Sequence, residues 1–529
     1  MKIRKSTACL IISSSHLGVS EDIVKIFSKI KTHFKAKVYH LGVVESEQES
    51  KDIRKAKVKF EAATQRFNKL GENAKEDTRD KLEDEKYEAG QNYKETKNAV
   101  TERIKSLVKI FNGITFVVPP KSRDTVPKGD GITVIEGEIT LSKYLFMTGI
   151  QPVSDCSTLR PANRNTIMAL KQYGQAYSWI VPHPVPVVIP YARLGLNNVH
   201  NYYTPGMLKH TGQPSKRQEN YMASHAPAAI LVILDDSNGE FHAVPLHIDY
   251  IEKKGYSRSK PVVLYDGLCF STDGIKEVDT KDRAMFETDD HEPEQHPGTI
   301  GAVRALNNLF KPYTFINGGD ASTCQPISRH EKDLKGRTEN LRIRDMLVGL
   351  QKLLKVQTDC PSIKERILID SNHADWLTLF VDEIPQLKGL LDWTTVAAQW
   401  LPEWSVRLRD GECSPPYQFG DYTIRHGDQE PFNNAELMFP FGKYLCGHFH
   451  KYQAFRRSVS VGCGGSLNPL FMKNKINNWQ NQITTMTRLM GITAIAPKII
   501  LHDPGKKASR VLYRGQILEI PYYFINKQQ

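Results

Sequence analysis

Five short polar motifs follow one another between residues 289 and 450, and their residue types are those of metal ligands and of acid–base catalysts. Each motif comes directly after an apolar run that is typical of a β-strand. Because the carboxyl ends of parallel strands meet at one edge of a sheet, we expect the motifs to lie together there. In chain order they are Asp289-Asp290-His291, Gly319-Asp320, Ser371-Asn372-His373, His426-Gly427 and Gly447-His448-Phe449-His450.

This set of side chains predicts a centre for two divalent metal ions. Carboxylates, imidazoles and an amide, without thiolates, suit catalytic manganese, iron or zinc better than a structural zinc, and we favour Mn²⁺. Two ions that share one carboxylate lie roughly 3.5–4 Å apart and can act together on a phosphate ester. We expect Asp320 to be the shared ligand. One ion would be held by Asp289, His291, Asp320 and His450, and the other by Asp320, Asn372, His426 and His448.

The order of the motifs resembles the calcineurin-like metallophosphoesterase family, whose pattern is D-x-H, G-D, G-N-H-D/E, H and G-H-x-H. The matching residues cover about a third of the chain. The resemblance implies an α/β (α+β) fold class, with a β-sandwich flanked by helices at the catalytic domain. It also implies that His373 acts as the acid or cation near the leaving oxygen, with Asp320 as the other catalytic residue. His296 and His330 are expected to be surface or supporting histidines because the ligand set is already full.

Three departures from the family pattern bear on the substrate. Ser371 replaces the usual Gly, Ala374 displaces the acidic residue, and Thr323 stands where many phosphomonoesterases carry a second Asp. These departures favour phosphodiester cleavage, as in the SbcD-type repair nucleases, over a protein phosphatase. The whole chain resembles phage-encoded pre-early nucleases that degrade host DNA. This resemblance implies a metal-dependent DNase that acts in the host cell cytoplasm.

Composition agrees with a partner of negative charge. The 529 residues carry a formal net charge of +12, which favours nucleic acid because Lys and Arg displace its condensed counterions, although solubility alone is an alternative reading. The eight cysteines form no C-x-x-C motif, and no apolar stretch approaches the roughly 20 residues that span a bilayer. We therefore expect a cytoplasmic protein without a membrane partner.

Cations that follow the last metal motif are candidates for contacts with the DNA backbone. They lie where a phosphate chain entering the site would pass, although solvated loop charges are the alternative. The candidates are Lys451, Arg456, Arg457, Lys473 and Lys475.

Composition shifts along the chain predict four segments. They are an N-terminal α/β domain at 1–150 that carries a helical arm at about 45–109, a β-rich module at 151–275, the catalytic domain at 276–470 and a C-terminal cap at 471–529. The arm lacks proline and is rich in charge, so it predicts an antiparallel helical hairpin. Its role is either oligomerisation or DNA gripping, or it is a solvated insertion, and we expect a homo-oligomer. The cap should contain a helix at 478–490 and strands at 493–501 and 510–520.

A weak echo of the metal motifs occurs near the N-terminus. Ser13-Ser14-Ser15-His16-Leu17-Gly18 follows an apolar strand and imitates a D-x-H loop, and His40-Leu41-Gly42-Val43 falls where G-D would be. This segment is either a metal-free copy of the phosphoesterase half-sheet or an unrelated β-α-β unit.

Two other functions stay open at the level of the sequence. A phosphoesterase of small molecules or proteins would need a closed pocket and no basic surface. A DNA-binding host-takeover scaffold would use the metal site only for structure.

Overall fold

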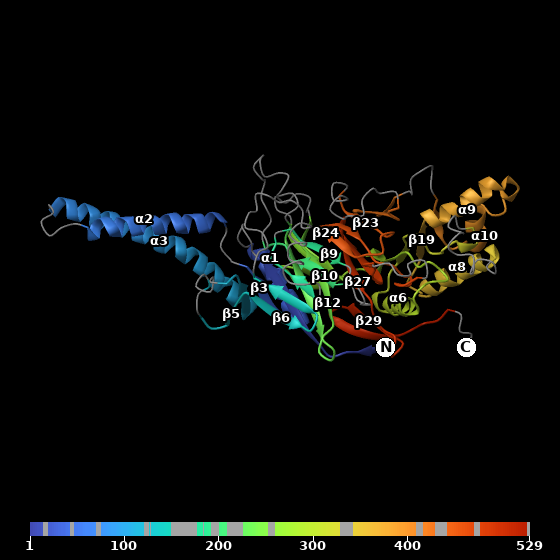
Figure 1. Ribbon diagram of the computed structural model, residues 1–529, viewed down its shortest axis with the longest axis horizontal. Coiled ribbons are helices and arrows are strands. Elements are labelled where there is room, and N and C mark those ends of the chain that lie inside the picture. The colour runs from blue at the N-terminus through green and yellow to red at the C-terminus, as the bar shows by residue number, and fades with distance from the viewer. Residues whose placement is uncertain are drawn as a thin grey trace.

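The computed structural model describes residues 1–13, 20–42, 47–69, 76–120, 126, 129–149, 177–183, 185–191, 200–208, 226–251, 260–327, 342–408, 416–428, 442–469 and 477–525. In these ranges the chain is a mixed α/β fold whose strands form five sheets. Figure 1 shows the sheets in the middle of an elongated molecule, with a long helical hairpin at one end and α8, α9 and α10 at the other. No helix within these ranges is long and apolar enough to cross a membrane.

The sheet that carries the first three metal motifs has the order β20-β19-β18-β17-β26-β27. Strands β17 to β20 are parallel, and β26 pairs antiparallel with β17. The strands are β17 (Arg283–Glu287), β18 (Thr314–Asn317), β19 (Glu365–Ile369), β20 (Ser405–Arg407), β26 (Gln482–Leu489) and β27 (Ile492–Ile499). The helices that connect them are α6 (Pro297–Phe310), α8 (Ile343–Gln357), α9 (Asn372–Glu383) and α10 (Trp393–Trp400), with short 3₁₀ turns at Thr280–Asp282, Gln325–Ile327 and Pro385–Leu387.

A second six-stranded sheet, with the order β12-β11-β2-β3-β4-β5, contains the N-terminal strands. Its members are β2 (Ser6–Ser13), β3 (Lys37–Leu41), β4 (Ile114–Val118), β5 (Ile132–Glu136), β11 (Ala228–Asp235) and β12 (Phe241–His247). Helix α1 (Glu21–Phe34) connects β2 to β3 and buries its apolar side, including Phe27 and Ile30, in the core.

The predicted helical arm is present as α2 (Glu47–Asn68) and α3 (Glu76–Phe111), which run side by side away from the sheets (Figure 1). The rings of Phe60 and Tyr93 stack between the two helices with their centroids 6.2 Å apart. Arg66 and Glu85 add an exposed ion pair of 2.9 Å. The role of the arm stays a prediction.

The remaining strands form one ten-stranded sheet and two four-stranded sheets. The large sheet has the order β21-β22-β23-β25-β24-β9-β10-β8-β7-β6. Its strands are β6 (Glu138–Ser142), β7 (Leu145–Thr148), β8 (Ser178–Ile180), β9 (Val187–Tyr191), β10 (His200–Thr204), β21 (Tyr417–Phe419), β22 (Tyr422–Arg425), β23 (Tyr444–Cys446), β24 (Gln453–Phe455) and β25 (Ser458–Ser460). The small sheets contain β1 (Lys2–Ile3), β30 (Gln516–Pro521), β29 (Ala508–Tyr513) and β28 (Leu501–Asp503), and β13 (Asp249–Ile251), β14 (Lys260–Tyr265), β15 (Leu268–Ser271) and β16 (Ile275–Glu277).

One apolar core joins the large sheet to both six-stranded sheets. Ile11 of β2, Leu445 of β23 and Phe286 of β17 belong to the same buried cluster. Because alternate residues of a strand point to opposite faces, Met285 points the other way and joins a cluster with Leu306 of α6. The loops that carry the metal motifs are thus supported by strands that are buried on both faces.

The C-terminal segment differs from the prediction. Residues 482–489 form strand β26 rather than a helix, and the strand pairs with β17 in the register Met285↔Thr485. Its three threonines are β-branched and favour an extended backbone that tertiary pairing then fixes. This segment therefore completes the metal-motif sheet instead of capping it.

The sheets also do not follow the predicted division of the chain. Strands β11 and β12, from the predicted module at 151–275, complete the N-terminal sheet, and β6 to β10 share a sheet with β21 to β25. The four segment boundaries stay predictions about the sequence, while the hydrogen-bonded units cross them.

Candidate metal centre

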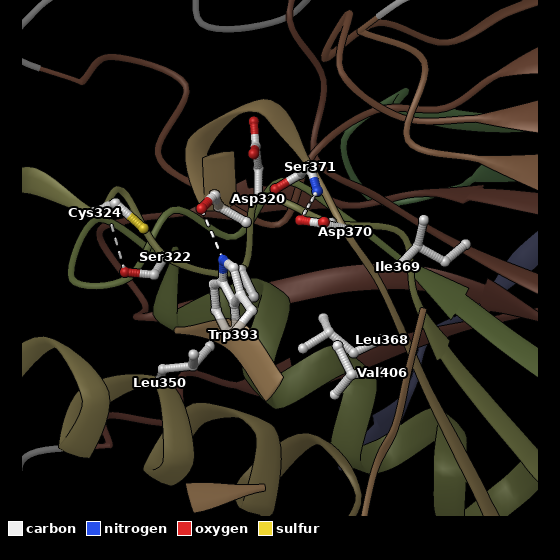
Figure 2. Close-up of a pocket in the computed structure, with 13 residues that line it drawn as sticks. Asp320, Ser322, Cys324, Leu350, Leu368, Ile369, Asp370, Ser371, Trp393 and Val406 are labelled. Carbon is white, nitrogen blue, oxygen red and sulfur yellow. Dashed lines mark hydrogen bonds between the residues drawn. The ribbon is translucent and has the colours of Figure 1, made fainter. Parts of the chain in front are cut away.

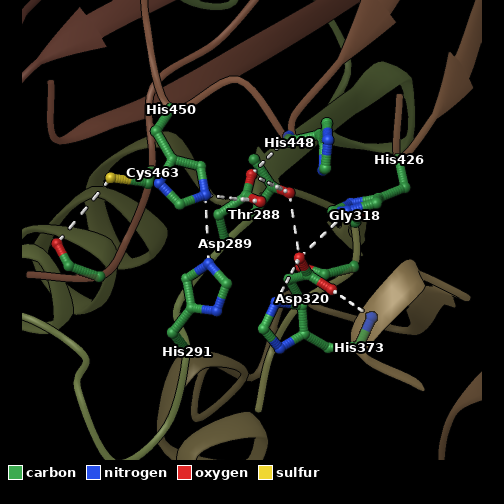
Figure 3. Close-up of polar contacts among 12 residues, drawn as sticks. Thr288, Asp289, His291, Gly318, Asp320, His373, His426, His448, His450 and Cys463 are labelled. Carbon is green, nitrogen blue, oxygen red and sulfur yellow. Dashed lines mark hydrogen bonds and ion pairs between the residues drawn. The ribbon is translucent and has the colours of Figure 1, made fainter. Parts of the chain in front are cut away.

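The predicted ligands come together, as Figure 3 shows for Asp289, Asp320 and the histidines around them. The prediction of one sheet edge was wrong, because the motifs follow β17, β18 and β19 of one sheet but β22 and β23 of another. The backbones of the ligands are unusual, because five ligands have positive φ values. These are Asp289 (57°), His291 (53°), Asp320 (48°), His448 (65°) and His450 (55°). A left-handed conformation is unfavourable for a residue with a side chain and persists where the surrounding structure enforces it, most often at functional sites. The strain is therefore concentrated where the side chains must converge.

Asp289, His291 and His450 form the first group of candidate ligands. Their ligand atoms lie within 4.8 Å of one another, and all three residues are buried. The Nε2 atoms of His291 and His450 are 3.1 Å apart, and the same His450 atom is 3.2 Å from Asp289 Oδ1. Two ring nitrogens and a carboxylate oxygen that point at one small volume fit a shared cation well.

Asp320, His426 and His448 form the second group. His426 Nδ1 is 2.9 Å from the carbonyl oxygen of Gly318, so this nitrogen carries a hydrogen and donates it. In neutral imidazole the other nitrogen, Nε2, then has a lone pair, yet it faces Asn372 Oδ1 at 2.9 Å and Asp320 Oδ2 at 3.2 Å. Three acceptors that face one another require a cation or a proton between them, and the donor set therefore fits a divalent ion.

His373 lies beside both groups. Its Nδ1 is 3.0 Å from the carbonyl oxygen of Thr323, and its Nε2 is 3.8 Å from Asp320 Oδ2. His373, His291 and Asp320 also satisfy the distance condition for a metal group. The side chain is 21% exposed, more than the other members. The geometry allows His373 to reach either an ion or a bound substrate.

The charges of the centre are mutually stabilised. Burial alone would lower the pKa of His450, but the Asp289 carboxylate outweighs it and raises that pKa to about 10. Burial also lowers the pKa of His426, but the Asp320 carboxylate outweighs it and raises that pKa to about 9. The pKa of His291 falls to about 3, because it is buried and next to His373 and His450. Protons and metal ions therefore compete for the same atoms.

Glu287 and Asp290 form a buried network behind the centre that the sequence did not reveal. Gln357 Nε2 donates to Asp290 Oδ2 at 2.9 Å, and Asn317 Nδ2 donates to the same oxygen at 3.1 Å. Burial and the neighbouring Asp290 raise the pKa of Glu287 well above its usual range. Burial of the two carboxyls together favours a proton shared between them, and the hydrogen bonds to Asp290 fix the loop between Asp289 and His291. Asp290 lies in a motif, but nothing in the sequence connects Gln357 to it.

A small cavity of about 30 Å³ lies beneath Asp320 (Figure 2). Leu350, Leu368 and Val406 line its apolar part. Trp393 closes it and donates from Nε1 to the carbonyl oxygen of Ala374 at 2.7 Å. This contact holds the first turn of α9, which carries the metal-facing Asn372 and His373.

The predicted DNA contacts are in different surroundings. Lys451 is half-buried and directly follows the ligand His450, whereas Arg456 follows β24 at the end of that strand away from the metal motifs. The Arg457 side chain is only 11% exposed and pairs with Asp249 at 2.8 Å. Arg457 Nη2 also donates to the carbonyl oxygen of Ile248 at 3.1 Å, so it connects two sheets instead of facing solvent. Lys473 and Lys475 lie outside the described residues.

His296 and His330 are the two histidines that were predicted not to be ligands. His296 begins α6, where its Nδ1 accepts a hydrogen bond from Gly298 N at 3.0 Å, and its ring stacks on His502 with the centroids 3.7 Å apart. It is absent from the metal groups found among the described residues. His330 lies outside these residues.

Among the comparisons with known proteins, only the search of solved structures found a similar chain. No protein-family model matches the chain. No curated protein matches it. Among solved structures it is similar to Vps29 from Chaetomium thermophilum, over 50% of this chain and 98% of that chain, with 9% sequence identity and a TM-score of 0.25.

Proposed function

We propose that the chain is a metal-dependent phosphodiesterase of the calcineurin-like metallophosphoesterase type that cleaves DNA. The observation that carries the proposal is the position of Asp320, which belongs to the group with His426 and His448 and also lies within ligand distance of His291, a member of the group with Asp289 and His450. A carboxylate shared between neighbouring groups is the arrangement that brings two cations close enough to act on one phosphate. A structural site would instead be closed by four ligands around one ion.

The residues of the chain supply the remaining chemistry. Two divalent ions, when bound, would generate the attacking hydroxide and offset the negative charge of the phosphate. Asp289, His291, Asp320, Asn372, His426, His448 and His450 would hold them. His373 is held by the Thr323 carbonyl through Nδ1, which leaves Nε2 directed at the site. From there it can give a proton to the departing oxygen.

The choice of DNA as substrate rests on charge and on one departure from the phosphomonoesterase pattern. The net charge of +12 favours a polyanion. At position 323 a backbone carbonyl, and not a carboxylate, orients His373. The proposed role is degradation of host DNA by a phage-encoded enzyme with Mn²⁺ as its cofactor, in the host cytoplasm, on the strength of the sequence resemblance.

Incubation of the purified protein with linear and circular duplex DNA, with and without Mn²⁺, tests this function. We expect cleavage only with metal, and none with an Asp320→Asn variant that has been shown to be folded. Hydrolysis of small phosphate esters without any action on DNA would favour the small-molecule phosphoesterase. Bound metal without hydrolysis of either substrate would favour the remaining alternative, a DNA-binding scaffold whose metal site is structural.

A further inference from the structure

The thirty strands of the described chain fall into two series of fifteen with the same pairing pattern. In one six-stranded sheet the order is β12-β11-β2-β3-β4-β5, and in the other it is β27-β26-β17-β18-β19-β20. The large sheet reads β6-β7-β8-β10-β9 from one edge and β21-β22-β23-β25-β24 from the other. The parallel and antiparallel pairings agree at each step, for example β2 with β3 and β17 with β18. Each strand therefore has a counterpart fifteen strands later.

Local features repeat with the strands. Helices α1 and α6 each have 14 residues and follow the first parallel strand of their series. Both end in Phe-Lys, at Phe34-Lys35 and Phe310-Lys311, and the two lysines have φ values of 52° and 53°. The same residue pair in the same left-handed cap is a specific coincidence of sequence and backbone.

A hairpin near the end of each series repeats as well. The segments Val263-Leu264-Tyr265-Asp266-Gly267 and Val511-Leu512-Tyr513-Arg514-Gly515 share four of five residues. Both turns have two central residues with positive φ, at 48° and 77° in the first and at 45° and 77° in the second. Such turns match the twist of the flanking strands.

The two series meet as a two-fold pair would. Strands β9 and β24 are counterparts and pair antiparallel with each other in the middle of the large sheet. The two equivalent turns touch, since Arg514 N donates to Asp266 Oδ2 at 2.9 Å. Strand β1 pairs with β30, and its counterpart β16 pairs with β15, so each series completes a sheet of the other. We call residues 2–271 the first repeat and residues 275–521 the second repeat.

The first repeat lacks most of the metal ligands. Paired strand positions, such as Ile11↔Tyr39 and Phe286↔Ile316, give the register between the repeats. Counted along the chain from these positions, Asp289, His291, Asp320, Asn372, His426, His448 and His450 align with Ser14, His16, Val43, Pro120, Gly149, His183 and Val185, so two of the seven counterparts are histidines. Ser14, His16 and Val43 lie outside the described residues, and the comparison there is of sequence alone. Both carboxylates are gone, including the shared one. All metal groups found among the described residues belong to the second repeat.

A cavity of about 600 Å³ lies between the repeats and is lined by Trp479, whose ring contacts the candidate ligand His450. The first repeat contributes Tyr144, Asn201 and Tyr203 to its lining, and the second contributes Trp479, Asn481 and His502. The ring centroid of Trp479 is 4.1 Å from that of His450. Asn201 is 2% exposed, and its Oδ1 has no hydrogen-bond partner within the described chain, while its Nδ2 donates to Tyr203 OH at 3.0 Å. This acceptor is buried beside the cavity wall and lacks a partner, so a small rotation of the Asn201 side chain toward the cavity would let it accept a hydrogen bond from a ligand.

We propose that the first repeat is a metal-free copy of the second and serves it by forming one wall of a binding site for a nucleoside. This occupant rests on the proposed action on DNA. Amide groups and aromatic faces around a volume of this size suit a base and its sugar, whose phosphate would lie on the His450 side of Trp479. The catalytic and non-catalytic repeats thus divide phosphate chemistry from nucleoside recognition.

Metal content per chain tests the first half of the proposal without any substrate. We expect about two Mn²⁺ ions per chain in the intact protein, measured by elemental analysis after gel filtration. The matched variants His183→Asn and His448→Asn change equivalent positions, and Asn retains an acceptor for the Val185 N–H that His183 Nδ1 now receives at 3.1 Å. His183→Asn should keep both ions and His448→Asn should lose at least one. Four ions per chain, or loss of metal in His183→Asn, would overturn the assignment.

Binding of thymidine monophosphate, compared with inorganic phosphate, tests the second half. Calorimetry on the Mn²⁺-loaded protein needs no turnover, so its result is separate from that for DNA cleavage. Asn201→Leu should weaken nucleotide binding about tenfold, the effect of one lost hydrogen bond, and leave phosphate binding unchanged. Tyr203→Phe is a milder second variant if Asn201→Leu melts early. Equal affinity of the native protein for nucleotide and phosphate, or an equal loss for both in the variants, would refute a nucleoside site at this wall.

Discussion

Replacing His373 by Ala should separate metal binding from turnover. The side chain is 21% exposed and is held by one hydrogen bond of 3.0 Å to Thr323 O, so its removal leaves the seven expected ligands in place. If His373 protonates the leaving oxygen, kcat should fall by about 10²–10⁴, the usual contribution of a general acid. This factor corresponds to about 3–5 kcal/mol of transition-state stabilisation. Metal content should stay near that of the native protein.

Two phosphodiesters with different leaving groups make the assay specific. A nitrophenyl ester leaves as a weak base and needs little help from an acid, whereas an alkyl ester or DNA leaves as a strong base. His373→Ala should therefore slow the alkyl ester much more than the nitrophenyl ester, with elemental analysis of bound Mn²⁺ run on the same preparations. The reasoning is refuted if the variant loses an ion, because His373 then acts as a ligand beside His291 and Asp320, or if both esters slow equally.

Four further expectations follow from the same geometry. Asp320→Ala and His448→Ala should each abolish hydrolysis in Mn²⁺ while circular dichroism shows a folded protein, and normal activity of either variant would exclude the two-metal assignment. Lys451→Ala should weaken binding to all DNA sequences alike and reduce the salt dependence by about one unit of slope, measured with metal withheld; an unchanged slope means that DNA enters by another face. Arg457→Ala should instead lower the free energy of unfolding by about 1–3 kcal/mol, because it leaves a buried carboxylate short of a partner, and a urea titration showing no loss would argue against that ion pair. Burial lowers the pKa of His40 to about 4, so below about pH 6.5 the unfolded state binds a proton at this residue and the folded state does not. The free energy of unfolding should therefore fall between pH 6.5 and pH 4. His40→Gln should reduce that dependence by up to about 1.4 kcal/mol per pH unit, measured by urea titrations at pH 7 and pH 5.

Local patterns were sufficient for the elements around the metal motifs. Strands β22 (Tyr422–Arg425) and β23 (Tyr444–Cys446) end directly before their motifs, as the apolar runs there predict, because short apolar runs before polar loops specify buried strands. The helical arm was also predictable, since a long charged segment without proline favours helices whatever its surroundings. The rule that parallel strands bring their carboxyl ends to one edge accounts for the grouping of ligands within each sheet, but the meeting of the two sheets at one centre depends on tertiary packing.

Other features depend on contacts between residues far apart in the chain. The threonine-rich strand β26 was misread as a helix, because a strand is fixed by pairing with a neighbour, here β17, some 200 residues away. Arg457 looked like a surface cation until the fold placed Asp249 beside it.

Residue type and short-range periodicity are written directly in the chain, so the candidate ligands and the local elements that present them could be predicted from it. The extent of the N-terminal echo, over fifteen strands, became visible only in the strand pairing of the folded chain. The reason is physical: strand pairing depends on backbone hydrogen bonds and on buried apolar faces, which many sequences satisfy. Two repeats can therefore share a fold although the counterpart of Asp320 is Val43, and an alignment of the two sequences finds few identical residues.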